Sequence, residues 1–149
     1  MMKNTDPGFS YGYQSRATHR AFDRLLQQQL SKHNLANGFW YVLRVLWERE
    51  GMSQRELADG VNLTESSTVI VLENMKKAGL VRRRRDPHDR RRQRVYLTAK
   101  AKRLKAKLLP LAFEINAIAA QDIDGADLAT YLRVAHKLRE NLTVARERV

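Results

Sequence analysis

Apolar side chains recur every three or four residues along most of the chain, which is the spacing of one face of a helix. The first such stretch covers residues 10–33, and a second covers residues 39–50. Two more follow residue 98, with apolar positions at residues 104–118 and 128–142, separated by Asp124 and Gly125. The pattern predicts a mainly α-helical protein with long amphipathic helices at both ends.

Between residues 53 and 79, the sequence carries two helix starts separated by a sharp turn. Ser53 and Glu56 have the spacing of a capping box, in which each side chain accepts a hydrogen bond from the other residue's backbone amide. Asn62 follows the short helix and tolerates the left-handed conformation that a sharp turn needs. Thr64 is then expected to cap a longer helix that ends before Gly79.

Two short alternating stretches around a proline predict a β-hairpin. Residues 80–85 alternate weakly, whereas residues 93–97 alternate clearly and place Val95 and Leu97 on one face. Asp86 and Pro87 between them are typical of turns. Residues 82–94 hold eight arginines against two aspartates, so their formal charge of +6 is half of the chain's +12. The arginine cluster therefore lies on a hairpin rather than in a solvated tail.

Composition narrows the classes of function. A chain of 149 residues with 43% hydrophobic residues can bury one core, and a net charge of +12 favours nucleic acid or another polyanionic partner. The absence of cysteine excludes disulfides, thiolate metal sites and thiol redox sensing. No apolar run is long enough to span a membrane, and the polar start does not suggest a signal peptide. We therefore expect a soluble, cytoplasmic protein with no membrane partner.

The sequence lacks the residue patterns that are typical of catalytic sites. It contains no paired carboxylates in an apolar setting, no nucleophile elbow and no phosphate-binding glycine loop. His19 and His33 lie about 21 Å apart on one expected helix, too far to share a metal ion. We therefore expect no enzyme activity, no cofactor and no metal site.

The order of the predicted elements is that of a winged helix-turn-helix. Its motifs resemble those of the MarR family of bacterial transcription regulators: Leu57-Ala58, Leu63-Thr64, Gly79-Leu80-Val81-Arg82-Arg83, Asp86-Pro87-x-Asp89-Arg90-Arg91 and Val95-x-Leu97-Thr98. The resemblance covers most of the chain, from the first helix to the last. It implies a mainly α winged helix-turn-helix with N- and C-terminal dimerisation helices and a two-stranded β-hairpin wing. It also implies a homodimer that binds a palindromic operator in double-stranded DNA, usually as a repressor.

The resemblance implies a helical dimerisation region at residues 1–37 and 98–149, and a winged helix-turn-helix lobe at residues 38–97. The four-and-three spacing of apolar residues after Thr98 is that of a coiled-coil-like seam. The same helices could pack within one chain. Because one short helix-turn-helix core leaves them little partner surface, we favour a seam between two copies.

The resemblance also assigns roles within the wing. It implies that Arg91 enters the minor groove and that Asp89 orients the wing through ion pairing. The enhanced negative potential of a narrow minor groove independently favours an inserted arginine. Strand alternation lets only about half of the other wing arginines face the DNA. The candidates for phosphate contacts are Arg83, Arg84, Arg90, Arg92 and Arg94.

The helix after Thr64 is expected to lie in the major groove. Thr68, Leu72 and Met75 fit its inward stripe, which leaves Ser66, Val69, Ile70, Glu73 and Lys77 on the opposite face. Relatives often carry a threonine and an arginine where this chain has Val69 and Ile70. Either both are core residues of a slightly rotated helix, or they contact thymine methyl groups. The expected DNA contacts are Ser53, Gln54, Arg55, Thr64, Glu65, Ser66, Ser67, Val69, Ile70, Glu73, Arg84, Arg90, Arg91, Arg92 and Arg94.

The resemblance further implies a small-molecule effector, often an aromatic acid, bound between the dimerisation helices and the DNA-binding lobe. By position, the candidate ligand contacts are Arg16, His19, Trp40, Tyr41 and Phe113. An acyl-coenzyme A thioester is a second candidate ligand. In the alternative interpretation Trp40 and Tyr41 pack the core, and the protein binds DNA without any effector.

Overall fold

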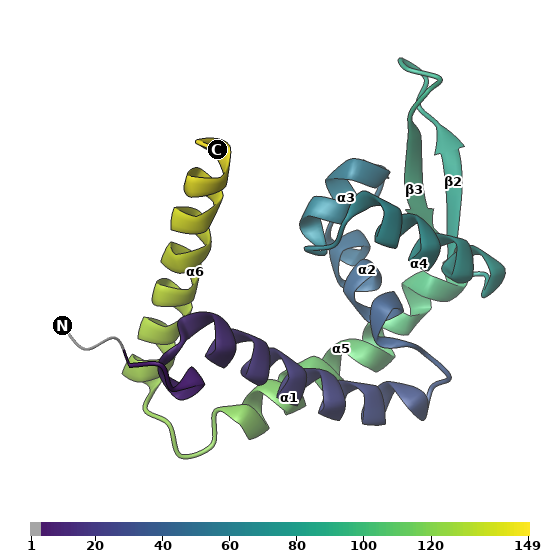
Figure 1. The fold of residues 1–149 in the computed structure, drawn as a ribbon. Helices are drawn as coiled ribbons and strands as arrows, with labels where there is room; N and C mark the ends of the chain where they lie inside the picture. Colours follow the sequence, from purple (N-terminus) through teal and green to yellow (C-terminus); the bar gives the residue numbers. More distant parts are fainter. Residues whose placement is uncertain (1–3) are drawn as a thin grey trace. The chain divides into compact units, whose positions relative to one another are not determined.

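Six α-helices and a small antiparallel sheet make up residues 4–149, the part of the chain that the computed structural model describes (Figure 1). The mainly α winged helix-turn-helix predicted from the sequence is confirmed. The described residues contain no helix that combines the length and the apolarity needed to cross a bilayer. The elements are a short 3-10 helix at Pro7–Phe9, α1 Tyr11–Ser31, α2 Asn37–Glu48, β1 Met52–Ser53, α3 Gln54–Gly60, α4 Glu65–Lys77, β2 Val81–Arg85, β3 Gln93–Leu97, α5 Ala99–Ala119 and α6 Gly125–Glu147.

The chain forms two compact units that divide within α5, the first ending at Phe113 and the second beginning at Glu114. The first unit contains the helix-turn-helix and the sheet, and the second contains the end of α5 and the whole of α6. The division into a dimerisation region and a DNA-binding lobe concerns how copies assemble, so it stays a prediction.

The core of the first unit lies around α2, which contacts α1, α3, α4 and β3. Val42, Leu43 and Leu46 of α2 are buried, Trp40 is 5% exposed, and Phe39 is only half-buried. The helix begins at Asn37, two residues earlier than expected. Fully buried side chains come from almost every element of this unit: Leu30, Leu43, Leu46, Leu57, Leu72, Met75, Leu80, Leu97 and Leu108.

The predicted helix caps are confirmed atom by atom. The backbone amide of Glu56 donates to Ser53 Oγ at 3.1 Å, and the amide of Ser53 donates to Glu56 Oε2 at 2.9 Å. Asn62 takes the left-handed conformation, with φ of 56°. Thr64 Oγ1 accepts from the amide of Ser67 at 3.2 Å. Local side-chain chemistry therefore fixes where α3 ends and where α4 begins.

The sheet has the order β1-β3-β2, so the predicted hairpin carries a third strand of two residues. β2 and β3 pair antiparallel from Val81 opposite Leu97 to Arg85 opposite Gln93.

The base of this hairpin is joined to both neighbouring helices by Thr98. Its Oγ1 donates to the Gly79 carbonyl at 2.7 Å and accepts from the amide of Ala101 at 3.2 Å. Thr98 thus caps α5 and also binds the loop that follows α4.

Truncating Leu72 tests which face of α4 packs against the core. Leu72 is fully buried, so Leu72→Ala should lower the free energy of unfolding by about 2–5 kcal/mol through lost burial and a residual cavity. Ile70 lies on the same helix with 65% exposure, so the control Ile70→Ala should stay within about 0.5 kcal/mol of wild type. Urea unfolding measures both changes, and a comparable loss in the two variants would show that Ile70 is a core residue.

Candidate nucleic-acid interface

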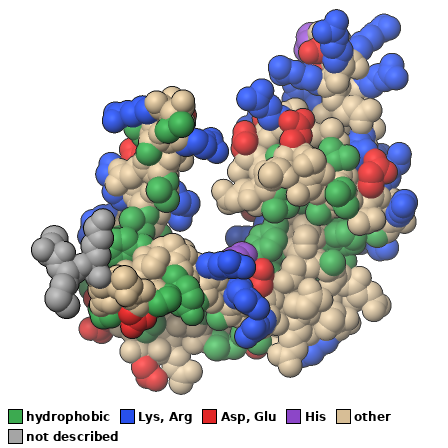
Figure 2. Space-filling view, in the orientation of Figure 1, with side chains coloured by type: hydrophobic (Ala, Val, Ile, Leu, Met, Phe, Trp, Pro, Cys, Tyr) green, Lys and Arg blue, Asp and Glu red, His purple; other side chains and the backbone are tan. Residues whose placement is uncertain are grey.

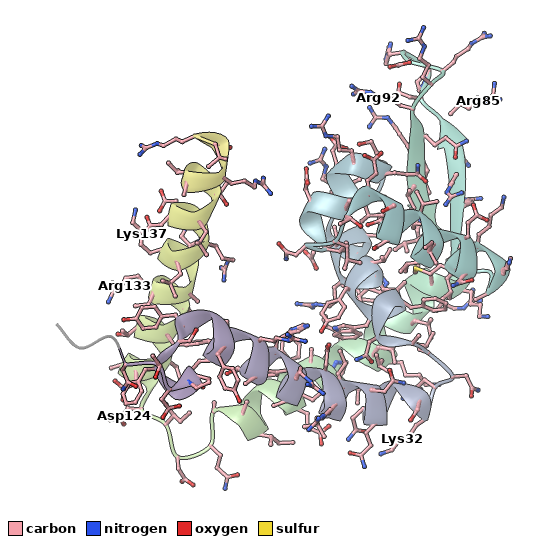
Figure 3. All side chains as sticks on the ribbon, viewed as in Figure 1. Lys32, Arg85, Arg92, Asp124, Arg133 and Lys137 are labelled. Atoms are coloured by element: carbon pink, nitrogen blue, oxygen red, sulfur yellow. The ribbon has the colours of Figure 1, made fainter. Side chains whose placement is uncertain are left out.

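The β2–β3 hairpin extends beyond the helices of its unit and carries a dense cluster of positive charge (Figures 1 and 2). Its far end is covered by arginine side chains, and Figure 3 labels Arg85 and Arg92 among them. Both of these side chains are exposed. The hairpin, called the wing below and defined as residues 81–97, is held together by three carboxylates.

Asp86 is the carboxylate at the turn of the wing, and its side chain is only 7% exposed. Its Oδ1 accepts from the amide of His88 at 2.8 Å, and its Oδ2 accepts from Arg94 Nε at 2.8 Å. Arg94 Nη1 also donates to the Gly51 carbonyl at 2.8 Å. Arg94 therefore links the wing to the loop after α2, and at least two of its donors are already used within the chain. Its predicted phosphate contact stays a prediction.

In the sequence, Asp86 indicates only a turn, and its ion pair with Arg94 was not predicted. Strand alternation places Arg84 directly opposite Arg94, and two like charges at that spacing repel each other. Asp86 offsets this repulsion because it neutralises Arg94. A carboxylate at the end of a strand, eight residues before an arginine of the returning strand, is the signal that could have revealed the pair.

Asp89 orders the tip of the wing. Its Oδ1 accepts from the amide of Arg91 at 3.0 Å, and its Oδ2 lies 3.5 Å from Arg92 Nε. The structure therefore shows Asp89 ion-paired, as the resemblance implies, with Arg92 as the partner. The guanidinium of Arg91 is exposed, and only its backbone is bound to Asp89. Its predicted entry into the minor groove stays a prediction.

Arg83 points towards α4, where its Nη1 donates to Glu73 Oε1. It shares the buried face of the sheet with Val81 and Val95, and its side chain is only 14% exposed. Its Nε and Nη2 are buried with no hydrogen-bond partner in the described residues. The hydrogen bond from Arg83 lowers the pKa of Glu73. Two residues expected to contact DNA separately thus bind each other, and no spacing along the chain predicts this pair.

The remaining wing arginines have no ion-pair partner among the described residues. Within residues 4–149, no carboxylate lies at ion-pair distance from Arg82, Arg84, Arg85, Arg90 or Arg91. All five are exposed. The guanidinium of Arg84 lies 5.4 Å from the centre of the Tyr96 ring, so its position is fixed by a cation–π contact. The wing can therefore offer several positive groups to one polyanion.

The outward face of α4 lies beside the wing in the same unit (Figure 1). Thr68, Leu72 and Met75 are fully buried, which confirms the predicted inward stripe. Val69 is half-buried, but Ile70 is 65% exposed. The interpretation of both residues as core is therefore wrong for Ile70. The first turn of the helix is polar and exposed, and comprises Thr64, Glu65, Ser66 and Ser67.

The hydroxyls of this first turn are linked to one another. Thr64 Oγ1 lies 3.2 Å from Ser66 Oγ and donates to Ser67 Oγ at 2.9 Å. At the start of the neighbouring α3, Arg55 is exposed, whereas Ser53 and Gln54 are partly buried. α3 and α4 contact each other, and the exposed amide end of α4 suits an anionic ligand. DNA contact by these residues stays a prediction.

The candidate ligand residues do not all meet. Trp40 is 5% exposed and packs edge-on against Trp47 at 5.9 Å between ring centres. His19 and Tyr41 meet at Asp23: His19 Nε2 lies 3.2 Å from Asp23 Oδ2, and the Tyr41 hydroxyl donates to Oδ1. Burial, followed by this hydrogen bond, raises the pKa of Tyr41.

The other two candidates are more open, since Arg16 is exposed and Phe113 is 63% exposed. Trp40 therefore lies in the core, as one of the two interpretations expected. Sequence reasoning overlooked Asp23, although its position four residues after His19 on one helix was a usable signal. Ligand binding at these residues stays a prediction.

Asp86 makes the stability of the wing depend on pH. The amide of His88, followed by the Arg94 guanidinium, lowers the pKa of the Asp86 carboxyl below its ordinary value of 3.8. The stabilising contribution is therefore complete above a pH of about 4 and is lost as the pH falls through the lower, folded-state pKa. Asp86→Asn should lower the urea midpoint at pH 7, and the difference from wild type should shrink towards pH 2.

The matched control for this change is Asp59→Asn, which removes one carboxylate from an exposed position on α3. It should leave the urea midpoint at pH 7 nearly unchanged. Equal midpoints for Asp86→Asn and wild type at pH 7 would refute the stabilising role of Asp86.

Comparison with known proteins places this arrangement among transcription regulators. Residues 38–92 match the model of the MarR family. The regulator TtmR of Methylorubrum extorquens (strain PA1) is 32% identical over 108 residues, which cover 72% of this chain. That match spans only 55% of the length of TtmR.

Two solved structures share the fold over most of their length. A MarR transcriptional regulator from Methanosarcina mazei Go1 has a TM-score of 0.81 at 24% identity, over 89% of this chain and 96% of the other. A MarR family regulator from Listeria monocytogenes, solved with 26mer DNA, has a TM-score of 0.81 at 20% identity, over 95% and 90%. At these identities the likeness shows the fold.

Proposed function

This chain belongs to the MarR family, and from that premise we propose that it is a DNA-binding transcriptional regulator. It acts as a homodimer, binds a palindromic operator and represses transcription there. A small anionic ligand, either an aromatic acid or an acyl thioester, releases it from the DNA. The related protein TtmR is named as a transcriptional regulator, and the Listeria monocytogenes structure contains DNA, which supports the proposal.

The observation that carries the proposal is the free positive charge of the wing. Five exposed arginines with no carboxylate partner in residues 4–149 lie on one hairpin: Arg82, Arg84, Arg85, Arg90 and Arg91. Guanidinium groups bind phosphate oxygens, and each neutralised phosphate releases counterions. Binding through such a wing should therefore weaken steeply as the salt concentration rises.

Two parts of the interface would meet two grooves of the duplex. The exposed first turns of α4 suit the major groove, which is wide enough to admit a helix. The wing extends beyond α4 and suits the adjacent minor groove, where an inserted Arg91 meets the strongest negative potential. The backbone bond to Asp89 sets the conformation of the tip from which Arg91 projects.

The second unit supplies the support for a homodimer. Among its apolar positions, Leu132 is 68% exposed and Leu142 is 70% exposed, and α6 buries no residue within one chain. A row of exposed leucines on one helix is costly in water and is stabilised when a second copy covers it. We therefore assign α6 to the dimer interface.

The proposal has two forms, with and without an effector. Arg16 is exposed on α1, three residues before His19, and its positive charge favours the form with an anionic ligand. The burial of Trp40 against Trp47 favours the form without one. Release of bound DNA by an added aromatic acid or coenzyme A thioester would support the form with an effector. Unchanged DNA binding with every ligand of such a panel would support the form without one.

Arg91→Ala tests the wing assignment. Because the variant loses a groove-entering charge, its affinity for DNA upstream of its own gene should fall by about 5- to 150-fold. Fluorescence anisotropy at several salt concentrations measures both the affinity and the salt slope. Arg20→Ala removes the same charge from an exposed position on α1 and should change the affinity little. Unchanged affinity in Arg91→Ala would contradict the wing assignment.

Leu132→Asp tests the dimer interface. Burying a new carboxylate between two copies of α6 is strongly unfavourable, so the variant should be monomeric at micromolar concentration. Light scattering after size-exclusion chromatography gives the mass of each species. Arg133→Ala on the adjacent, exposed position serves as the control and should stay dimeric. A Leu132→Asp variant that remains a dimer would place the interface elsewhere.

A further inference from the structure

Ile70 is a large apolar side chain on the outward face of α4, with 65% of its surface exposed. Its own helix does not need it for packing, because Thr68, Leu72 and Met75 fill the inward stripe and are fully buried. An exposed isoleucine at this position gains nothing within the chain. Its surface is removed from water only when a partner covers α4.

The neighbours of Ile70 define what it presents to that partner. Ser66 and Asn74 lie four residues before and after it, and both are exposed, so the three side chains form one row along the helix. Glu73, the acidic group nearest to this row, is held by Arg83. One oxygen of its carboxylate is therefore already occupied within the chain. The centre of the row is left apolar.

Among the four bases, only thymine offers an apolar group in the major groove, its C5-methyl. We infer that Ile70 is a specificity-determining residue that packs against the C5-methyl group of a thymine in the bound operator. This inference rests on the proposed function, since it requires α4 to lie in the major groove. It goes further in naming the base feature that is read and the side chain that reads it.

Replacing thymine by deoxyuridine removes the methyl group and keeps base pairing. The probe is a duplex whose sequence is defined by footprinting the wild-type protein on DNA upstream of its own gene, with each thymine replaced in turn. At one position in the half-site, wild-type affinity should fall about fourfold, the equivalent of about 0.8 kcal/mol for one buried methyl. Fluorescence anisotropy at fixed salt measures each duplex.

In the variants Ile70→Ser and Ile70→Ala, the affinity difference between the thymine and deoxyuridine duplexes should be clearly smaller than in wild type. Loss of a methyl also alters the shape of the DNA, but that effect is the same for every protein and cancels when the variants are compared with wild type. Asn74→Ala serves as the matched control on the same row and should keep the fourfold difference. Because Ile70 is exposed, all three variants should fold as wild type does.

Equal wild-type affinity for every deoxyuridine duplex would overturn the inference. A deoxyuridine effect that persists unchanged in Ile70→Ser would overturn it too, because another residue would then read the methyl. Both results leave the proposed function intact, since DNA is still bound. A wild-type protein that binds no DNA at all would instead refute the proposed function, and the inference with it.

Discussion

Eight positive charges within thirteen residues repel one another, and the conformation of the wing depends on the carboxylates that reduce this repulsion. Asp86 neutralises Arg94 at the turn, Asp89 pairs with Arg92 at the tip, and Glu73 holds Arg83 against α4. Each carboxylate also fixes the backbone or joins the wing to a helix. The wing is therefore rigid where its charges are paired and strongly positive where they are not.

The same ion pairs affect the two parts of the candidate interface, the wing and α4, in different ways. Under the proposed function, the wing arginines bind phosphate at any sequence and supply affinity and salt dependence rather than choice of base. Base choice then falls to the outward face of α4, where a serine, an isoleucine and an asparagine lie in a row. The arginine cluster also acts on α4, because Arg83 binds Glu73, one of the two acidic residues of that helix.

Local chemistry explains what could be predicted from the sequence. The capping box at Ser53, the turn at Asn62 and the cap at Thr64 each depend on residues that lie within four positions of one another. The spacing along the chain was therefore sufficient to predict each of them. The pair of Arg83 with Glu73 joins two elements, and its geometry depends on how β2 packs on α4. The two-residue strand β1 has too short a pattern to be recognised, and it forms only because β3 offers it an edge.

The periodicity of α4 was enough to predict which side chains face inward, but it did not decide whether Ile70 is buried. Its hydrophobicity suggested a core residue, whereas Thr68, Leu72 and Met75 already fill the space under the helix, and Ile70 is exposed. Trp40 shows the opposite case: a residue considered for ligand binding lies in the core, where it packs against Trp47. Which side chains fill the interior depends on how the elements pack, and no single residue reveals that.

Thr98 is the point where the end of α4, the base of the wing and the start of α5 are joined through one hydroxyl group. The first part of α5 and the helix-turn-helix belong to one compact unit. A rotation of α5 about its axis would therefore strain the hydrogen bonds that Thr98 makes to the Gly79 carbonyl and to the first turn of α5. Under the proposed function, the start of α5 is thus a place where a change in the helix would reach both the wing and α4.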